Sequence, residues 1–143
     1  MEAHWLIYAI LALGAVYMGY RLCSGASGVS KVGGSRPNIV LYYASWCPAS
    51  RAFLPAWKAV GQNIKALGWD IDMNSLNCDG ANNPDSVEVD VDGAVTVEPA
   101  VCNAYGIDGY PSVILYNNGQ EHHYEGARTP DKVITFIREK CGF

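Results

Sequence analysis

Basic residues are scarce and scattered in this 143-residue chain. It holds 10 Lys and Arg against 14 Asp and Glu, which gives a formal net charge of −4, and the basic residues form no cluster. Proteins that bind nucleic acid through its phosphates present a basic face. The composition therefore argues against a nucleic-acid partner.

Metal-binding patterns of cysteine and histidine are also absent. The five cysteines include no Cys-x-x-Cys pair, and the three histidines are His4, His122 and His123. The adjacent His122 and His123 would face opposite sides of a strand, which does not suit a shared ion. Since structural zinc needs a recognisable set of Cys and His ligands, we expect no metal and no bound cofactor.

Near the N-terminus there is no charged residue between Trp5 and Tyr20, and the segment is almost wholly apolar. Residues 1–23 are about long enough to cross a thin bilayer, so we expect a single-pass transmembrane anchor there. A cleaved signal peptide is the alternative interpretation. It would carry positive charge before the apolar run, where Glu2 stands instead.

The side of the membrane stays open between two arguments. Arg21, Lys31 and Arg36 follow the apolar run, and positive charge on that side favours a domain that faces the cytosol. The cysteine content favours an oxidising compartment such as the lumen of the endoplasmic reticulum. Residues 24–36 are rich in Gly and Ser and predict a flexible linker, so the globular domain covers 37–143.

Strand and helix signals alternate within the globular domain. The apolar run 38–44 predicts a buried strand, and a helix should follow from Cys47 to about residue 67, with Pro48 in its first turn. Thr129 and Pro130 begin a final helix that runs to about residue 140. Between these helices we expect a strand over 69–77, a short helix over 98–105, a strand over 112–117 and a returning strand over 121–125. This order predicts an α/β fold with a four-stranded mixed sheet flanked by helices.

Residues 79–98 exceed what a minimal core of this kind needs. Valines alternate with acids from Val87 to Asp92, and Asp92-Gly93 suits a tight turn before 94–97. We therefore predict an inserted β-hairpin. The stretch holds six acids and no Lys or Arg, which indicates a solvated acidic face. A docking surface for a basic partner and a calcium site are alternatives, although the spacing is not that of an EF-hand.

Cys47 occupies a chemically favoured position. At the start of a helix, unpaired N–H groups and the helix dipole stabilise the thiolate, which is the reactive form of cysteine. A Gly109-Tyr110-Pro111 turn leads into a later strand. Together these two features point to thiol chemistry.

Several blocks, in order, resemble the thioredoxin superfamily, and more closely its protein disulfide isomerase branch. The blocks span about 38–143 and read Tyr42-Tyr43-Ala44-x-Trp46-Cys47, Phe53-Leu54-Pro55-x-Trp57, Asn77-Cys78-Asp79, Cys102-x-x-Tyr105-Gly106-Ile107-x-Gly109-Tyr110-Pro111-Ser112 and Tyr124-x-Gly126-x-Arg128. The resemblance implies a thioredoxin-like fold.

The resemblance also implies roles for single residues. Cys47 would be the nucleophile that forms mixed disulfides with client proteins, and Pro111 would be the cis-proline beside it. Trp46 and the backbone of Tyr110 would bind an extended client segment. Arg128 matches an arginine that helps to tune active-site thiols.

Cysteines outside the motif also have expected roles. By the same resemblance Cys78 and Cys102 lie near each other, and we favour a structural disulfide between them over two free thiols. We expect Cys141 to be a free thiol near the C-terminus.

Two departures from the family pattern limit the chemistry. Ser50 replaces the resolving cysteine and makes the motif CxxS. A hydroxyl can hydrogen-bond the Cys47 thiolate but cannot attack a disulfide, so the domain cannot cycle as an internal dithiol. Leu41 stands where the family often keeps a buried acid for proton transfer, and its absence should slow proton handling.

Two hypotheses for function follow. In the first, the chain is a membrane-anchored monothiol thioredoxin-like protein that takes part in thiol–disulfide exchange with client proteins, as a protein disulfide isomerase-like oxidoreductase. In the second, it is a non-catalytic thioredoxin-fold binding or structural module on a cellular or viral membrane. A Cys47 thiol pKa near that of free cysteine would favour the second.

Overall fold

A computed structural model describes residues 36–143. The expected membrane anchor and nearly all of the Gly/Ser-rich linker lie outside the described residues. None of the helices within 36–143 combines the length and the apolar character that a membrane span requires.

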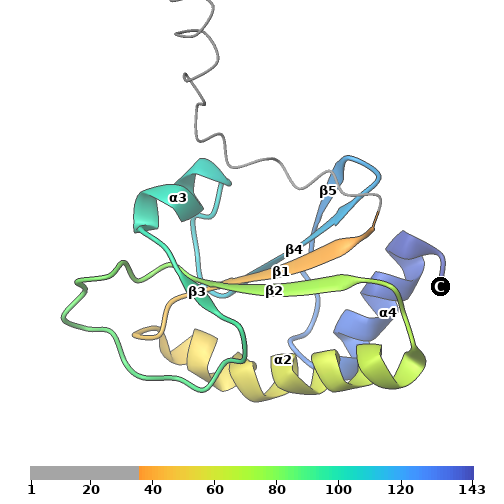
Figure 1. The fold of residues 1–143 in the computed structure, drawn as a ribbon, viewed down its shortest axis with the longest axis horizontal. Coiled ribbons are helices and arrows are strands. Elements are labelled where there is room, and N and C mark those ends of the chain that lie inside the picture. Colours follow the sequence, from red (N-terminus) through yellow and green to blue (C-terminus); the bar gives the residue numbers. More distant parts are fainter. Residues whose placement is uncertain (1–35) are drawn as a thin grey trace, which may run out of the picture. The chain divides into compact units, whose positions relative to one another are not determined.

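A five-stranded mixed sheet with the order β3-β2-β1-β4-β5 forms the centre of the domain (Figure 1). The central strand β1 (Asn38–Tyr43) pairs in parallel with β2 (Asp72–Asn77) and antiparallel with β4 (Ser112–Asn117). β5 (Gln120–His123) pairs antiparallel with β4, and β3 (Val95–Thr96) pairs in parallel with the end of β2. β1 is buried along its whole length, as its apolar run requires.

Three helices flank this sheet. Figure 1 shows α2 (Pro48–Leu67) and α4 (Pro130–Cys141) on one face and α3 (Pro99–Ala104) on the other. All three begin with a proline in the first turn, where the missing N–H leaves no helical hydrogen bond unmade. Gly68 caps the C-terminus of α2, and its φ of 66° is a left-handed conformation that glycine adopts readily.

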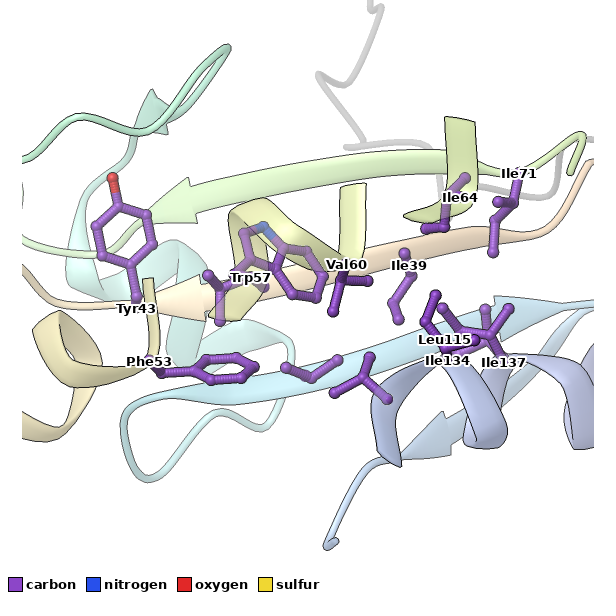
Figure 2. Close-up of a cluster of buried hydrophobic side chains, with 13 residues drawn as sticks. Ile39, Tyr43, Phe53, Trp57, Val60, Ile64, Ile71, Leu115, Ile134 and Ile137 are labelled. Carbon is purple, nitrogen blue, oxygen red and sulfur yellow. The ribbon is translucent and has the colours of Figure 1, made fainter. Parts of the chain in front are cut away.

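The larger core lies between the sheet and the helices α2 and α4 (Figure 2). Because side chains alternate along a strand, Leu41 and its neighbours at i±2 in β1 face this core, whereas Tyr42 faces the smaller cluster beside α3. Trp57 of α2 donates its indole N–H to the Ser75 hydroxyl at 2.9 Å, so this buried polar group is satisfied. The core therefore fixes α2, and with it the residue that precedes α2, against the sheet.

The expected α/β architecture with a mixed sheet is confirmed, with two changes. The sheet has five strands instead of four, because Val95–Thr96 adds to its edge. The second strand begins at Asp72, three residues later than predicted. Asn118 and Gly119 form the predicted turn, with φ values of 51° and 75°.

The predicted hairpin over 79–98 is wrong. Residues 81–94, which we call the covering segment, contain no strand, although Ala94 N–H bonds to Val91 C=O at 3.2 Å across the predicted Asp92-Gly93 turn. After the turn, the chain pairs with β2 instead of folding back on Val87–Val91. Val89 and Val91 pack against the α2 side of the core, whereas Val87 is 44% exposed, so these two valines alternate with acids because they are partly buried and not because the segment pairs as a strand. Within 36–143 no group of three His, Cys, Asp or Glu side chains could hold a metal ion.

Candidate active site

Cys47 lies at the junction between β1 and α2. It is the N-cap of α2, with φ −79° and ψ 119°, and its carbonyl accepts the first helical hydrogen bond from Arg51 N–H at 3.1 Å. Its own N–H bonds back to Ala44 C=O at 3.1 Å. The thiol is partly exposed, so a reagent can reach it while the backbone on both sides is held.

Backbone donors at the start of α2 stabilise the thiolate. The hydrogen bond from Ser50 N–H is the main cause that lowers the pKa of the Cys47 thiol, and partial burial opposes it. The Ala49 N–H, the Ser50 hydroxyl and the positive charge of Arg128 add to the lowering. This is the behaviour expected of a cysteine at a helix N-terminus.

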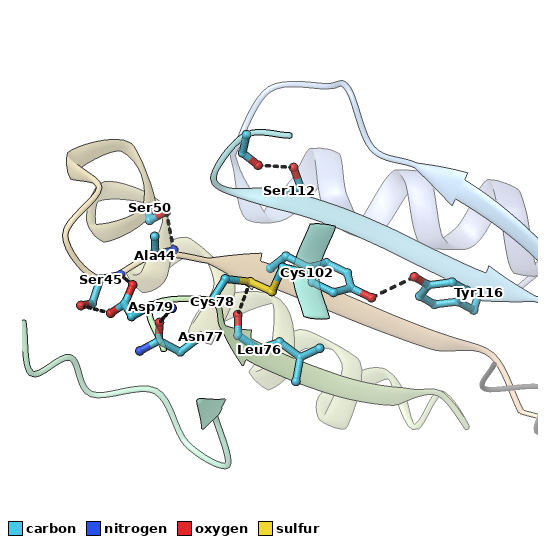
Figure 3. Close-up of a disulfide and its surroundings, with 12 residues drawn as sticks. Ala44, Ser45, Ser50, Leu76, Asn77, Cys78, Asp79, Cys102, Ser112 and Tyr116 are labelled. Carbon is cyan, nitrogen blue, oxygen red and sulfur yellow. Dashed lines mark hydrogen bonds between the residues drawn. A yellow bond between two sulfur atoms is a disulfide. The ribbon is translucent and has the colours of Figure 1, made fainter. Parts of the chain in front are cut away.

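Ser50 is fully buried beneath the thiol. Its hydroxyl oxygen accepts a hydrogen bond from Ala44 N–H at 3.3 Å (Figure 3). A serine hydroxyl has one proton to donate and two lone pairs, so its O–H stays available for the Cys47 sulfur. Ser50 can therefore stabilise the thiolate, but it offers no second thiol.

The turn before β4 forms the other wall of the site. The peptide bond between Tyr110 and Pro111 is cis, and the Tyr110 carbonyl accepts a hydrogen bond from the Cys47 thiol at 3.6 Å. The Trp46 ring meets the Tyr110 ring edge-on, with centroids 6.2 Å apart and an angle of 89° between planes. Trp46 is 44% exposed, so an apolar aromatic surface borders the thiol.

Arg128 approaches the site from the loop before α4. Its Nη2 donates to the Pro111 carbonyl at 3.4 Å. Together with Phe53, Val113 and Tyr124, it lines a cavity of about 370 Å³ behind Pro111. The structure thus brings Arg128, the cis-proline turn and Cys47 together, although they are far apart in the sequence.

Cys78 and Cys102 form a disulfide that joins the end of β2 to α3 (Figure 3). Their Cα atoms are 6.1 Å apart, within the usual range, and both residues are buried. In the described part of the chain the free cysteines are Cys47 and Cys141. Burial raises the pKa of the Cys141 thiol, so Cys47 is the more reactive of the two.

Two residues at the site had no assigned role in the sequence. Asp79 is buried directly after Cys78, and it accepts a hydrogen bond from Ser45 N–H at 2.9 Å. Ser45 lies in the loop that carries Cys47. Asp79 ends one of the matching blocks, but nothing in that block signals that its carboxylate turns towards the active-site loop. Leu41, by contrast, is fully buried in the apolar core and brings no acid to the site.

Comparisons with known proteins agree with this geometry. The thioredoxin family profile matches residues 82–139. The chain is 30% identical over 117 residues to a thioredoxin domain-containing protein of Acanthamoeba polyphaga mimivirus, covering 80% of this chain and 29% of that protein. It is 29% identical over 104 residues to Protein disulfide isomerase-like 1-5 of Oryza sativa subsp. japonica, covering 73% and 16%. The crystal structure of ERdj5 form I matches 82% of this chain and 13% of its own with a TM-score of 0.61 at 21% identity. The described domain has the thioredoxin fold.

The relatives are much longer than the domain that matches them. The chain spans 29% of the mimivirus protein and 16% of the rice protein. The likeness is therefore to one domain of each relative. The family profile matches the part of the chain that holds the Gly109-Tyr110-Pro111 turn and Arg128. Cys47 lies outside the matched residues.

Proposed function

We propose that the thioredoxin domain takes part in thiol–disulfide exchange and forms mixed disulfides with client proteins through Cys47. One observation carries the proposal. The partly exposed thiol begins α2 and receives hydrogen bonds from the N–H groups of Ser50 and Ala49, which lower its pKa. These are the conditions in which a cysteine is a good nucleophile near neutral pH.

The exchange step conserves both atoms and electrons. The Cys47 thiolate attacks one sulfur of a client disulfide, and a new bond joins Cys47 to that sulfur. The client's own S–S bond breaks, and the departing thiolate takes a proton from solvent. Nothing is oxidised or reduced overall, so no redox cofactor is needed.

Ser50 determines how the step ends. Since a hydroxyl cannot attack the mixed disulfide, a second thiol from the client or a small-molecule thiol must release it. The exposed Trp46 ring and the Tyr110–Pro111 turn offer an aromatic and backbone surface for the client segment around its cysteine. The domain then acts as a monothiol that captures, holds and isomerises, and not as a self-contained reductase.

The relatives support this class of chemistry. The rice relative is named protein disulfide isomerase-like, and the mimivirus relative is compatible with a viral as well as a cellular setting. We further propose that residues 1–23 anchor the domain to a membrane, which would confine its clients to those near the bilayer. Labelling of Cys47 in sealed membrane vesicles with an impermeant thiol reagent would reveal which side carries the domain.

Trapping of disulfide-linked partners tests the proposed exchange. Cells are quenched with acid and a thiol-blocking reagent, and mixed disulfides are separated on non-reducing gels. Wild type should yield adducts that disappear on reduction, and Cys47→Ala should yield none. Cys141→Ala is the matched control, because it removes a free thiol away from the site. Equal capture by Cys47→Ala and wild type would rule the proposal out.

Restoring the missing partner provides a second test. Ser50→Cys should let the domain form an internal disulfide and catalyse insulin reduction, with a potential within the range of about −270 to −120 mV of dithiol proteins with this fold. The rest of the site is already in place, including the cis-proline turn and Arg128. A folded Ser50→Cys variant that forms no internal disulfide would show that the site lacks exchange geometry.

The alternative is a binding or structural module without turnover. Leu41 favours it, because the fully buried apolar side chain provides no proton acceptor behind the thiol. The lowered pKa of Cys47 favours exchange instead. Titration of the Cys47 thiol distinguishes the two functions. A thiol that titrates like free cysteine would support the binding or structural module.

A further inference from the structure

A carboxylate is buried behind the loop that carries Cys47. Asp79 is 3% exposed, and within residues 36–143 no Lys or Arg lies within salt-bridge distance of it. A buried charge without an ionic partner is costly unless hydrogen bonds satisfy it. Its carboxylate accepts from both polar groups of Ser45, the N–H at 2.9 Å and the hydroxyl (Figure 3).

The Ser45 hydroxyl joins this carboxylate to a third part of the chain. While its proton points to Asp79, its oxygen accepts a hydrogen bond from Val87 N–H at 2.7 Å. Val87 belongs to the covering segment, and Ser45 itself is fully buried. One side chain therefore connects the end of β2, the Cys47 loop and the covering segment. Within residues 36–143 no buried side-chain nitrogen or oxygen lacks a hydrogen-bond partner.

The same loop determines where the Cys47 sulfur lies. Ala44, directly before Ser45, binds Cys47 N–H through its carbonyl and the Ser50 hydroxyl through its N–H. A shift of the Ser45 backbone would move both contacts together. The thiol would then lose its alignment with the N–H donors of Ala49 and Ser50.

We propose that Ser45 is a positioning residue: its hydroxyl joins the buried Asp79 carboxylate to the covering segment and thereby fixes the loop that presents the Cys47 thiol. The acidic covering segment, which forms no hairpin, thus helps to hold the Cys47 loop in place through its contact with Ser45. The inference deepens the proposed exchange function and rests on Cys47 being its reactive group.

Alkylation of Cys47 at a series of pH values tests the proposal without any client. The full chain reacts with iodoacetamide, and modification of Cys47 is followed by peptide mass spectrometry. The midpoint of the pH profile reports the thiol pKa. It is a better readout than the rate at one pH, because intrinsic nucleophilicity rises with pKa and partly compensates a loss of thiolate.

Ser45→Ala removes only the hydroxyl and leaves every charge in place. The midpoint should move up by about half a pH unit or more, which corresponds to a roughly threefold loss of thiolate below the midpoint. Val87→Pro removes the N–H that donates to the Ser45 hydroxyl and leaves Ser45 itself unchanged. It should also move the midpoint up. Val87→Ala, which keeps that N–H, is its matched control.

Asp90→Asn is a control for looser attachment of the covering segment in general. Lys58 of α2 and Asp90 of the covering segment form an exposed ion pair, with Nζ and Oδ2 3.4 Å apart, so this substitution weakens a contact of the segment that does not involve Ser45 and should leave the midpoint unchanged. Urea unfolding of each variant measures stability separately. If Ser45→Ala and Val87→Pro lose stability while their midpoints stay at the wild-type value, Ser45 has only a structural role and the inference fails.

The two proposals can fail independently. Wild type that alkylates with a low midpoint but traps no client would sink the exchange function and leave the positioning role standing. Wild type that traps clients, with midpoints unmoved in Ser45→Ala and Val87→Pro, would overturn the positioning role alone.

Discussion

The Cys78–Cys102 disulfide should contribute a large share of the stability of the domain. The two cysteines are separated by 24 residues in the sequence. In the chain-entropy description, closing a loop of this length removes about 3.5 kcal/mol of unfolded-state freedom at 25 °C. Domains of this size are stable by about 5–15 kcal/mol in total, so the crosslink accounts for roughly 20–70% of the free energy of unfolding.

Replacing both cysteines with alanine tests this magnitude. Both residues are buried, so the lost packing adds to the lost crosslink, and alanine avoids placing a hydroxyl in an apolar site. The Cys78→Ala/Cys102→Ala variant should lose about 3.5 kcal/mol or more in urea unfolding. Its denaturant dependence should be steeper, because the unfolded chain without the crosslink exposes more surface.

Comparison with the other cysteines separates the crosslink from a general effect. Cys141→Ala should change stability little, since its thiol is free and only partly buried. Wild type refolded under strong reductant should approach the double variant. A loss below about 1 kcal/mol, with Cys78 and Cys102 protected from alkylation in wild type, would refute the loop-entropy argument for this domain.

Two further predictions concern Cys47 and the core. Because the folded protein lowers the Cys47 pKa, thiolate formation adds stability that is fully present above the unfolded-state pKa of about 8.5. That stability is lost as pH falls through the folded-state value. In urea unfolding between pH 5 and 9.5, the free energy of unfolding of wild type should therefore rise relative to that of Cys47→Ser as the pH rises. A difference that stays constant with pH would contradict this prediction. Trp57→Phe should cost about 1–3 kcal/mol in the same assay, because the buried Ser75 hydroxyl loses its indole donor. Adding Ser75→Ala to Trp57→Phe should cost less than the sum of the single losses, and strict additivity would argue against a coupled hydrogen bond.

Local signals were enough to place most helices and strands. The strand Ser112–Asn117 and the turn at Asn118 and Gly119 lie where the sequence predicts them. A buried apolar run and a pair of turn residues specify their conformation largely by themselves. The helix start at Pro48 follows for the same reason, and it places Cys47 as the N-cap.

The covering segment shows where local signals fail. Alternating valines and acids occur in a half-buried strand, but they also occur in any extended segment with one side against a core. Whether such a segment pairs with itself depends on competing partners elsewhere in the chain. Here the Ser45 hydroxyl accepts the hydrogen bond from Val87 N–H, and β2 pairs with the residues after the turn.

The site depended on long-range contacts in a similar way. Cys47 is visible from its helix-start position, whereas Tyr110 and Arg128 could be assigned only through a resemblance to a family. Asp79 and Ser45 lie 34 residues apart, and only the fold brings the carboxylate to the serine. A hydroxyl at position 45 carries no distinctive sequence signal, so the sequence alone does not predict this network.

Ser50 affects the lifetime of a mixed disulfide in two opposite ways. It supplies no internal thiol, so an adduct at Cys47 waits for an external one. Yet its N–H and hydroxyl stabilise the Cys47 thiolate and lower the thiol pKa, and a thiol of lower pKa is a better leaving group in exchange. When a client thiol attacks the client-side sulfur of the adduct, Cys47 is therefore expelled readily. Such a site retains a client protein that has no second thiol within reach of the mixed disulfide, and it releases a client protein that has one. Isomerisation and thiol-dependent retention both require this selectivity.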